Sequence, residues 1–483
     1  MDEDGKRMEE GLNAKDDDVL KKEETSNINE DVNIDEHETN IMVKQKTKRI
    51  ATLDAFRGLT LVIMILVDKA GGVYPSINHA PWNGCALSDF VMPSFLFMVG
   101  VSIALALKRV EKIKYVVKKI MVRTLQLLFW GILLQGGFSH APDDLSYGVN
   151  LKFIRWCGIL QRIGFVYCVV ALIETFTTKL RPTTLTSGRI AIFKAYKWQW
   201  FGGFMAFLIY MITTFTLYVP DWSFVDHIIG DEPKRYTVKC GVRGHLGPGC
   251  NAVGYVDRQV LGVNHFYSHR VWRKLKECTF NAPYKGPLRE DAPSWCLAPS
   301  EPEGLLSSIS AILSGTIGIH YGHVLIHFKG HSERLKHWVS MGFVLLIIAI
   351  ILHFSNAIPI NKQLYSISYV CLTAGVAGIV FSVLYILIDV WGFRTPFLFL
   401  EWMGMNSMLV FAMAAQGIFE GFVNGWYYED PNNSLVHWIK KHVFVNVWKS
   451  ESVGTLLYVI FAEITFWAVV AGVLHKLKIY WKL

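Results

Sequence analysis

Charged residues are scarce in this 483-residue chain. Only 18% of the residues are charged, whereas 52% are hydrophobic and the mean hydropathy is +0.30. An ordinary soluble protein carries about 25% charged residues. The composition therefore excludes that class and indicates a protein that crosses a membrane several times.

The sequence also lacks the motifs of several large enzyme classes. It contains no Walker A loop, no Gly-x-Ser-x-Gly elbow, no Rossmann fingerprint and no His-Glu-x-x-His helix. No basic stripe interleaved with aromatic residues runs through a polar segment, and the cysteines do not have the spacing of a zinc site. We therefore expect neither a nucleic-acid partner nor a bound metal.

Residues 1–49 lack aromatic side chains and hold 15 acidic and 9 basic residues. Such a segment cannot bury enough apolar surface to offset its chain entropy, so we predict a disordered acidic tail. It has no apolar core of a cleavable signal peptide, so the first membrane segment acts as the insertion signal. The predicted domains are this cytosolic tail, 1–49, and a membrane domain, 50–483.

Ten apolar stretches are long enough to cross the roughly 30 Å hydrocarbon core of a bilayer. The sequence therefore predicts an all-α polytopic membrane protein with about ten transmembrane helices. The predicted spans are approximately 55–75, 87–107, 117–138, 158–177, 199–219, 305–328, 338–354, 365–390, 396–420 and 453–475.

The loops differ in charge. Lys and Arg gather after the second, fourth and sixth segments and at the C-terminus, which the positive-inside rule assigns to the cytosol. Both termini are then cytosolic, and one large loop of about 220–303 is luminal. The glycosylation sequon at Asn432 falls on the same luminal side.

The large loop carries four of the eight cysteines. In an oxidising compartment Cys240, Cys250, Cys278 and Cys296 can form two disulfides with three connectivities. We favour Cys240 with Cys250, because that pair closes a short turn rich in Gly and Pro. The alternative is that these thiols are free.

Several polar residues interrupt the apolar stretches, where they are costly and tend to be functional. Asp54 and Arg57 share a helix face, as a boundary ion pair or as part of a ligand site. Arginines that face the bundle suit a phosphate-bearing ligand, whereas snorkelling arginines lie nearer the helix ends. Asn406 and Ser407 bind a ligand or another helix. The cofactor-binding candidates are Arg57, Arg123, Arg162, Asn406 and Ser407.

His79 lies between the first two apolar stretches, in Ile77-Asn78-His79-Ala80-Pro81-Trp82-Asn83-Gly84. A histidine at a membrane boundary is partly dry, and a neutral imidazole there is a good nucleophile or general base. The alternative is a structural histidine, which is common at such boundaries.

Short motifs in one order, from about residue 50 onwards, resemble the heparan-α-glucosaminide N-acetyltransferase family of transmembrane acetyltransferases. The matching stretches are 53–58 (LDAFRG), 78–84 (NHAPWNG), 89–93 (DFVMP), 158–164 (GILQRIG), 246–249 (LGPG), 254–258 (GYVDR), 265–267 (HFY), 302–304 (PEG), 361–362 (NK), 366–369 (SISY) and 404–407 (GMNS). Relative to the animal enzyme, this chain resembles the catalytic membrane core alone.

The resemblance implies transfer of acetyl from cytosolic acetyl-CoA to a luminal sugar amine or hydroxyl, with His79 at the centre. His79 would carry the acetyl group or act as general base, and the backbone around Asn83 would stabilise the oxyanion. Lys362 is a further candidate for a phosphate contact, although it falls on the predicted luminal side. The implied setting is a multi-pass glycoprotein of the lysosomal or vacuolar membrane, in contact with membrane lipid. A homodimer is one option.

Asp68 departs from the pattern, because the animal enzyme has an amide residue at this position. We expect Asp68 to lie near the luminal end of the first segment, eleven residues before His79, and to fix the imidazole tautomer through a hydrogen bond. The alternatives are a buried neutral carboxyl group, or a simple pair with Lys69 or a neighbouring helix. The competing function for the whole chain is a transporter of an anionic small molecule or an acyl-CoA, with the same fold.

Overall fold

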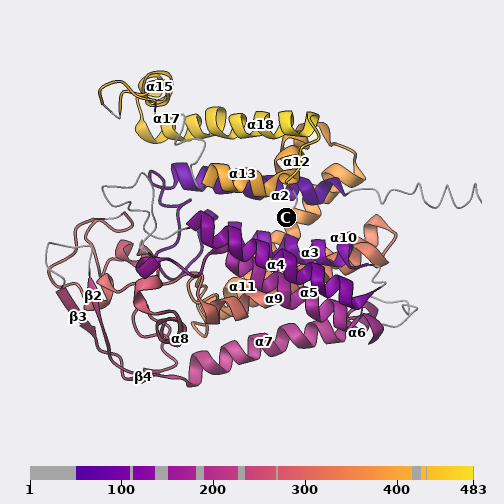
Figure 1. Ribbon diagram of the computed structural model, residues 1–483, viewed down its shortest axis with the longest axis horizontal. Helices are drawn as coiled ribbons and strands as arrows, with labels where there is room; N and C mark the ends of the chain where they lie inside the picture. Colours follow the sequence, from indigo (N-terminus) through magenta and orange to yellow (C-terminus); the bar gives the residue numbers. More distant parts are fainter. Residues whose placement is uncertain are drawn as a thin grey trace, which may run out of the picture. The chain divides into compact units, whose positions relative to one another are not determined.

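A computed structural model describes residues 50–108, 112–135, 151–180, 190–226, 234–267, 270–284, 286–415, 426–430 and 432–481. The chain separates into two units, Met1–Ile50 and Ala51–Leu483. The tail predicted for residues 1–49 lies outside the described residues. All the elements below belong to the second unit (Figure 1).

Long helices dominate this unit. They are α2 (Ala51–Ala70), α3 (Val91–Ala106), α4 (Ile113–Gln135), α5 (Ile159–Phe176), α7 (Lys197–Thr216), α9 (Leu305–His327), α10 (His331–Phe354), α11 (Ile367–Tyr385) and α18 (Thr465–Lys476). Shorter helices are α6 (Ala191–Ala195), α8 (Ala252–Leu261), α12 (Leu398–Met405), α13 (Ser407–Val410), α15 (Leu435–Ile439), α16 (Asn446–Trp448) and α17 (Glu451–Tyr458). Segments of π-helix extend α11 (Ile386–Val390), α13 (Phe411–Ala415) and α15 (Lys440–Val445), and join α17 to α18 (Val459–Ile464).

The described residues contain six helices that are long and apolar enough to cross a membrane, or seven with one bent pair. The six are Leu87–Ala106, Ile159–Phe176, Leu305–His327, His331–Phe354, Ile367–Val390 and Glu451–Lys476. The other predicted segments, 55–75, 117–138 and 199–219, coincide with the more polar helices α2, α4 and α7. The helical class is confirmed, whereas the count of ten spans, the cytosolic ends and the luminal loop stay predictions.

The bent pair replaces a single predicted span over 396–420. Helix α12 and the segment Ser407–Ala414 meet at Asn406 with a bend of 75°. Helix α12 packs closely against α2, and a side chain at Gly404 would overlap the Asp54 backbone. The chain is therefore held against α2 immediately before the bend.

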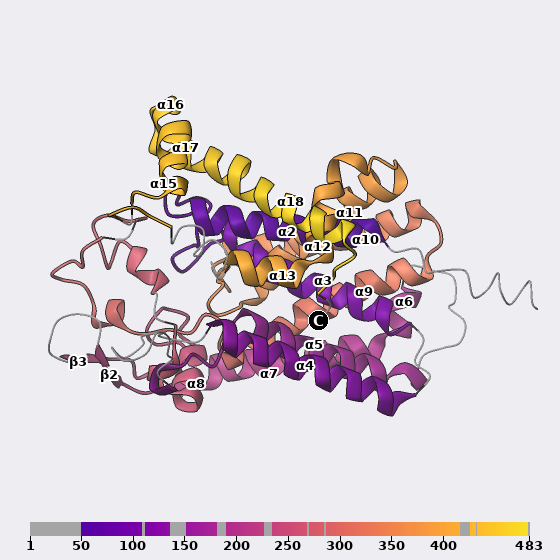
Figure 2. The same cartoon turned by 45° about the horizontal axis from the view of Figure 1, so that its top comes forward.

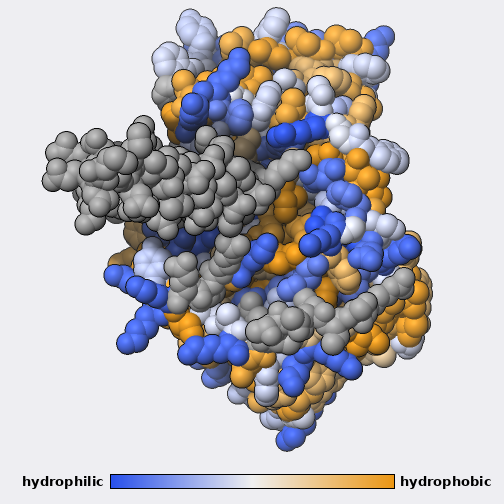
Figure 3. Space-filling model, turned by 90° about the vertical axis from the view of Figure 1, so that its right-hand side faces the viewer, coloured by the Kyte–Doolittle hydropathy of each residue, from blue (hydrophilic) through white to orange (hydrophobic). Residues whose placement is uncertain are grey.

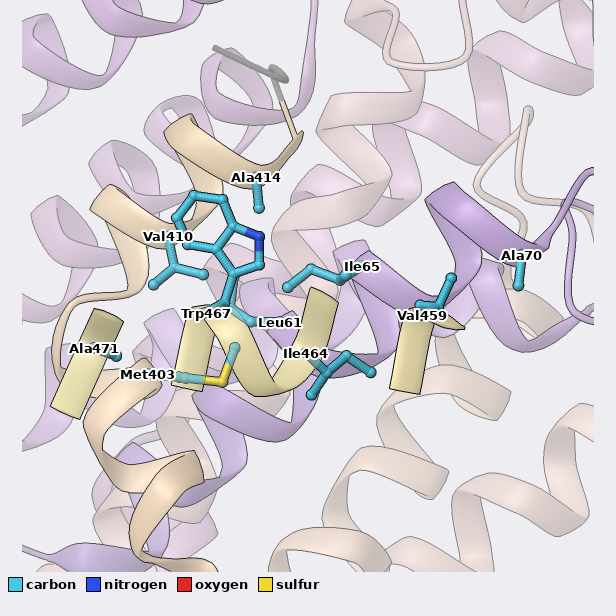
Figure 4. Close-up of a cluster of buried hydrophobic side chains, with 10 residues drawn as sticks. All are labelled: Leu61, Ile65, Ala70, Met403, Val410, Ala414, Val459, Ile464, Trp467 and Ala471. Atoms are coloured by element: carbon cyan, nitrogen blue, oxygen red, sulfur yellow. The ribbon is translucent and has the colours of Figure 1, made fainter. Parts of the chain in front are cut away.

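The helices pack through small residues and through apolar clusters. Helices α3 and α9 lie side by side, and a side chain at Gly318 would overlap the backbone of Phe97. Such close approach of two backbones is typical of helix pairs in membranes. Helices α2, α12, α13 and α18 enclose a cluster of buried hydrophobic side chains, in which Trp467 lies beside Val410 (Figures 1 and 4). Its members are Leu61, Ile65, Ala70, Met403, Val410, Ala414, Val459, Ile464, Trp467 and Ala471.

The predicted large loop has secondary structure of its own. Strands β1 (Tyr218–Val219) and β4 (Val242–Arg243) pair antiparallel, as do β2 (Trp222–Asp226) and β3 (Lys234–Val238). The expected Cys240–Cys250 disulfide is confirmed, and the remaining two loop cysteines form Cys278–Cys296. This region, which includes α8, lies beyond the ends of α7 and α9 in both ribbon views (Figures 1 and 2).

The opposite end of the helices carries α6 and the start of α10 (Figure 1). Figure 3 faces this end, where hydrophilic side chains are spread among hydrophobic ones. The sequence places Lys329, Arg334 and Lys336 next to the start of α10. The two ends of the helices therefore differ in character, since the other end carries the disulfide-linked loop.

Candidate active site

His79 lies in the loop between α2 and a short 3₁₀-helix, Leu87–Phe90, that leads into α3. Helix α2 ends as the N–H of Gly71 donates to the carbonyl of Val67 at 2.9 Å. Asn78 then closes the loop: its Nδ2 donates to the carbonyl of Gly71 at 2.8 Å, and its Oδ1 accepts the N–H of His79 at 2.7 Å. The loop therefore holds the backbone of His79 where the helix ends.

A buried carboxylate orients the imidazole. Oδ1 of Asp89 lies 2.7 Å from Nδ1 of His79, and the Asp89 side chain is fully buried. Oδ2 of Asp89 accepts the N–H groups of Ala80 at 3.1 Å and Ala86 at 3.0 Å. An ionised carboxylate only accepts hydrogen bonds, so Nδ1 of His79 carries the proton and donates it. Nε2 then keeps its lone pair and is the atom that can act as base or nucleophile.

Lys362 is the second charged group at the imidazole. Its Nζ lies 3.0 Å from Nδ1 and 3.5 Å from Nε2 of His79. The two loops that carry His79 and Lys362 are joined by an antiparallel bridge between Asn83 and Asn361, and by the Gly84 N–H, which donates to a backbone carbonyl at 2.8 Å. Gly84 has a φ of +106°, which a residue with a side chain rarely adopts.

The surroundings keep His79 neutral. Burial is the largest effect on the pKa of His79, and the positive charge of Lys362 adds to it. The hydrogen bond and charge of Asp89, and the charge of Glu303, act in the opposite direction. The net result is a His79 pKa below its usual value of 6.5, so the imidazole is uncharged at neutral pH.

A buried ion-pair network underlies the site. Nε of Arg155 donates to Glu301 at 2.8 Å, and its Nη2 donates to Glu303 at 2.6 Å. Burial raises the pKa of Glu303, but Arg155 and Lys362 lower it more, so Glu303 stays ionised. The Arg155 guanidinium also lies 4.5 Å from the ring centroid of Tyr267, on the cavity wall. The network thus connects the start of α9 with the site.

A cavity of about 390 Å³ opens beside His79. The His79 side chain is 37% exposed and forms part of its wall. One side of the cavity is the loop after α2, and the other belongs to the large disulfide-linked region. The lining residues are Gly71, Gly72, Pro75, Asn78, His79, Tyr267, Arg270, Val271, Lys274, Pro283 and Tyr284. A ligand in this cavity would meet the imidazole and two basic side chains.

The two other catalytic candidates lie close to this loop. Asp68 is exposed in the last turns of α2, shortly before the cavity wall begins at Gly71. The carboxylate found at Nδ1 of His79 is that of Asp89, where the sequence led us to expect Asp68. Asn83 is exposed, and its side-chain oxygen accepts a hydrogen bond from Asn361 at 3.2 Å. Catalytic roles for Asp68 and Asn83 stay predictions.

The candidates for cofactor binding lie on two sets of helices. Arg57 is on α2, paired with Asp54 at 3.4 Å as the spacing predicts, and hydrogen-bonded to Ser102. Asn406 and Ser407 lie at the bend after α12, which packs on α2. A direct role for these residues with acetyl-CoA stays a prediction.

Arg123 and Arg162 lie on the neighbouring helices α4 and α5. Arg123 lies over the ring of Tyr167, 4.9 Å from its centroid. Arg162 is buried and donates to Ser308 at 3.0 Å and to the carbonyl of Pro302 at 2.9 Å. It therefore fastens α5 to the start of α9. Binding of a coenzyme phosphate by either arginine stays a prediction.

Sequence reasoning missed the partners of His79. Asp89 begins the motif 89–93, inside the second predicted segment, but nothing local tied it to His79. Lys362 was considered for a phosphate contact, although it contacts the imidazole. Glu303 lay in the motif Pro302-Glu303-Gly304 without an assigned role. The available signal was the motifs themselves, because each of the three holds a charged residue, inside the second predicted segment for Asp89 and between predicted segments for Glu303 and Lys362.

The fold and the site define a helical membrane protein with a histidine, a carboxylate and a lysine beside a cavity. Residues 49–224 match the family model of the catalytic region of heparan-α-glucosaminide N-acetyltransferase. The protein of that name from Mus musculus is 30% identical over 460 residues, 91% of this chain and 61% of the mouse protein. The one from Homo sapiens is 29% identical over 456 residues, 90% of this chain and 60% of the human protein. The chain thus spans about three fifths of the length of these curated relatives. It is related to the heparan-α-glucosaminide N-acetyltransferases, and the resemblance predicted from its motifs is confirmed.

Proposed function

We propose that the protein is a transmembrane acetyltransferase that moves acetyl from cytosolic acetyl-CoA to a luminal sugar amine or hydroxyl. The observation that carries the proposal is the geometry of His79, inside the matched catalytic region: Nδ1 is bound by Asp89, and the side chain faces a cavity. A neutral imidazole held in this way is suited to proton abstraction or to nucleophilic attack.

The cavity suits a sugar. About 390 Å³ lies within the range of roughly 300–1,000 Å³ that is usual for small-molecule sites. Tyr267 and Tyr284 offer rings and hydroxyl groups, and Asn78 offers an amide. The cavity lies beside the disulfide-linked region, on the predicted luminal side, which supports its use by the acceptor.

His79 can serve the reaction in two ways. As general base, its Nε2 takes the proton of the acceptor while the acceptor attacks the thioester directly. As nucleophile, Nε2 first forms an acetyl-imidazole, which the acceptor then attacks. Incubation with labelled acetyl-CoA in the absence of acceptor separates the routes, because only the second leaves acetyl on the peptide that contains His79.

The test of the function is acetyl-CoA-dependent transfer by the purified protein, with glucosamine as the amine acceptor and glucose as the hydroxyl acceptor. The rate of transfer is measured as release of the free thiol of the coenzyme. His79→Ala should lower the transfer rate at least about 10²-fold, the low end for loss of an acid–base group. His437→Ala is the matched control, because this histidine is exposed on α15, and it should retain activity. Thermal stabilisation of both variants by acetyl-CoA would show that the donor still binds.

Undiminished transfer by His79→Ala would remove this histidine from the mechanism. The transporter hypothesis predicts movement of intact acetyl-CoA across sealed vesicles with no thiol release. The comparisons do not favour it, because both relatives are named as acetyltransferases.

A further inference from the structure

The side chain of Lys362 reaches the active site from the loop before α11. It is only 15% exposed. Its nearest carboxylate oxygen is Oδ1 of Asp89, at 3.7 Å. A lysine buried to this extent normally has a close partner that offsets the loss of hydration.

Asp89 is already engaged with other donors. Oδ1 accepts a hydrogen bond from the Nδ1–H of His79, and Oδ2 accepts hydrogen bonds from two backbone N–H groups. A separation of 3.7 Å is an ion pair and is too long for a hydrogen bond. Asp89 therefore stabilises the positive charge of Lys362 by attraction, but it accepts no hydrogen bond from the ammonium group of Lys362.

The imidazole does not satisfy Lys362 either. Nδ1 of His79 is protonated by the reasoning above, and so cannot accept from Nζ at 3.0 Å. Nε2, at 3.5 Å, lies at the limit of hydrogen-bonding distance. The ammonium group thus keeps N–H donors available beside the nitrogen at which the reaction takes place.

We propose that Lys362 is a catalytic residue of the acetyl transfer, and that its ammonium group stabilises the negative charge formed on the acetyl carbonyl oxygen. This inference rests on the proposed function. A fixed positive charge is an effective stabiliser of an oxyanion, because it needs no reorientation when the charge forms.

In the direct route, the acceptor nitrogen forms a bond to the thioester carbon, and the C=O π pair moves onto the oxygen, beside Lys362. Nε2 of His79 takes one proton from that nitrogen. The oxyanion then re-forms the C=O bond, the C–S bond breaks, and the coenzyme sulfur leaves with the electron pair. His79 returns its proton to the sulfur, so that an amine and acetyl-CoA give an amide and the free thiol. The covalent route passes through an oxyanion in each of its two steps.

Lys362 also affects the protonation of His79, which distinguishes it from a residue that only forms an ion pair with Asp89. Its charge lowers the pKa of His79, whereas the charges of Asp89 and Glu303 raise it. The cavity wall adds the cations Arg270 and Lys274. Removal of Lys362 should therefore raise the His79 pKa, and the acidic limb of the pH–rate profile should move to higher pH.

The experiment compares Lys362→Met with Lys276→Met, an exposed lysine of the large loop. For Lys362→Met we expect kcat to fall by about 10²–10³, as for loss of one oxyanion donor. The KM for acetyl-CoA should stay within a few-fold of the wild-type value, and the acidic limb should move to higher pH. Lys276→Met should match the wild type in all three measurements.

Lys362→Ala with added ethylammonium extends the test. Rescue of its kcat by the small cation, but not by an uncharged alcohol of similar size, supports a role for the charge itself. This readout holds even if Lys362→Met folds poorly, because it compares one variant with and without the cation.

Three outcomes would overturn the assignment: kcat of Lys362→Met close to wild type, an acidic limb that stays in place, or no rescue by ethylammonium. In each of these cases an active wild type leaves the proposed function intact. A wild type that transfers no acetyl to any acceptor would instead reject the proposed function itself.

Discussion

Asp89→Asn is the sharpest test of the imidazole geometry. Oδ2 of Asp89 accepts two backbone N–H groups, from Ala80 and Ala86, so an asparagine must keep its carbonyl oxygen at that position. Its NH₂ group then takes the place of Oδ1, 2.7 Å from Nδ1 of His79. A donor at this position forces Nδ1 to become the acceptor, and the imidazole proton moves to Nε2. The reacting nitrogen loses its lone pair.

The magnitude follows from this change of tautomer. The same kind of substitution in a catalytic triad lowers kcat by about 10⁴, which corresponds to about 5.5 kcal/mol in the barrier. Loss of general-base catalysis alone costs about 10²-fold at the low end. We therefore expect kcat of Asp89→Asn to fall by about 10²–10⁴. Asp89 also raises the pKa of His79, so the acidic limb of the residual activity should move to lower pH.

The assay is thiol release from acetyl-CoA over a range of pH, with thermal unfolding as the measure of folding. Asp291→Asn is the control of the same chemistry, because Asp291 is 67% exposed and pairs with Arg289 on the surface. A rate for Asp89→Asn within a few-fold of wild type, in a folded protein, would refute the assignment of the tautomer. A shift of the acidic limb to higher pH would refute the electrostatic account.

Two further predictions concern topology and stability. Asn432 is exposed, so expression in a secretory-pathway host should give a glycosidase-sensitive mobility shift that Asn432→Gln abolishes; a tail protected from protease in sealed microsomes would contradict the orientation. Burial raises the pKa of Asp257 to about 7, while its Oδ1 accepts the N–H of Leu305 at 2.8 Å. The ionised form is thus disfavoured in the folded protein, and the contribution of Asp257 to stability is lost as pH rises from about 4 to 7. The free energy of unfolding of Asp257→Asn, relative to that of the wild type, should therefore rise over this pH range by up to about 4 kcal/mol. Thermal unfolding of both proteins measured against pH checks this, and a difference in stability that does not change with pH would contradict it.

Much of the architecture follows from local sequence. Each of the ten apolar stretches has a helical counterpart in the described residues, because a helix satisfies the backbone hydrogen bonds of a long, mostly apolar segment within the segment itself. The Cys240–Cys250 disulfide was also predictable, since its two cysteines are ten residues apart around a Gly/Pro turn. His79 stood out for a similar reason, in a constrained loop between two apolar segments.

The break at Asn406 was not predictable from composition. The polar residues Asn406 and Ser407 interrupt the apolar stretch 396–420, and the regular helix ends at Asn406. Hydropathy measures the transfer of side chains into an apolar medium. It contains no information on which backbone another helix approaches, so the close packing of α12 against α2 is known only from the tertiary structure.

The sequence by itself determined the helical membrane class, the disulfide-bearing loop and the central histidine, because these depend on composition and on neighbours along the chain. Only the tertiary structure decided which charges surround that histidine. Asp89 follows it by ten residues and Lys362 by 283, yet both lie within 3.0 Å of Nδ1. Bridges between two distant loops create this contact. Electrostatic effects act over a few ångströms in space, whatever the separation along the chain, and so the protonation of His79 is a property of the fold.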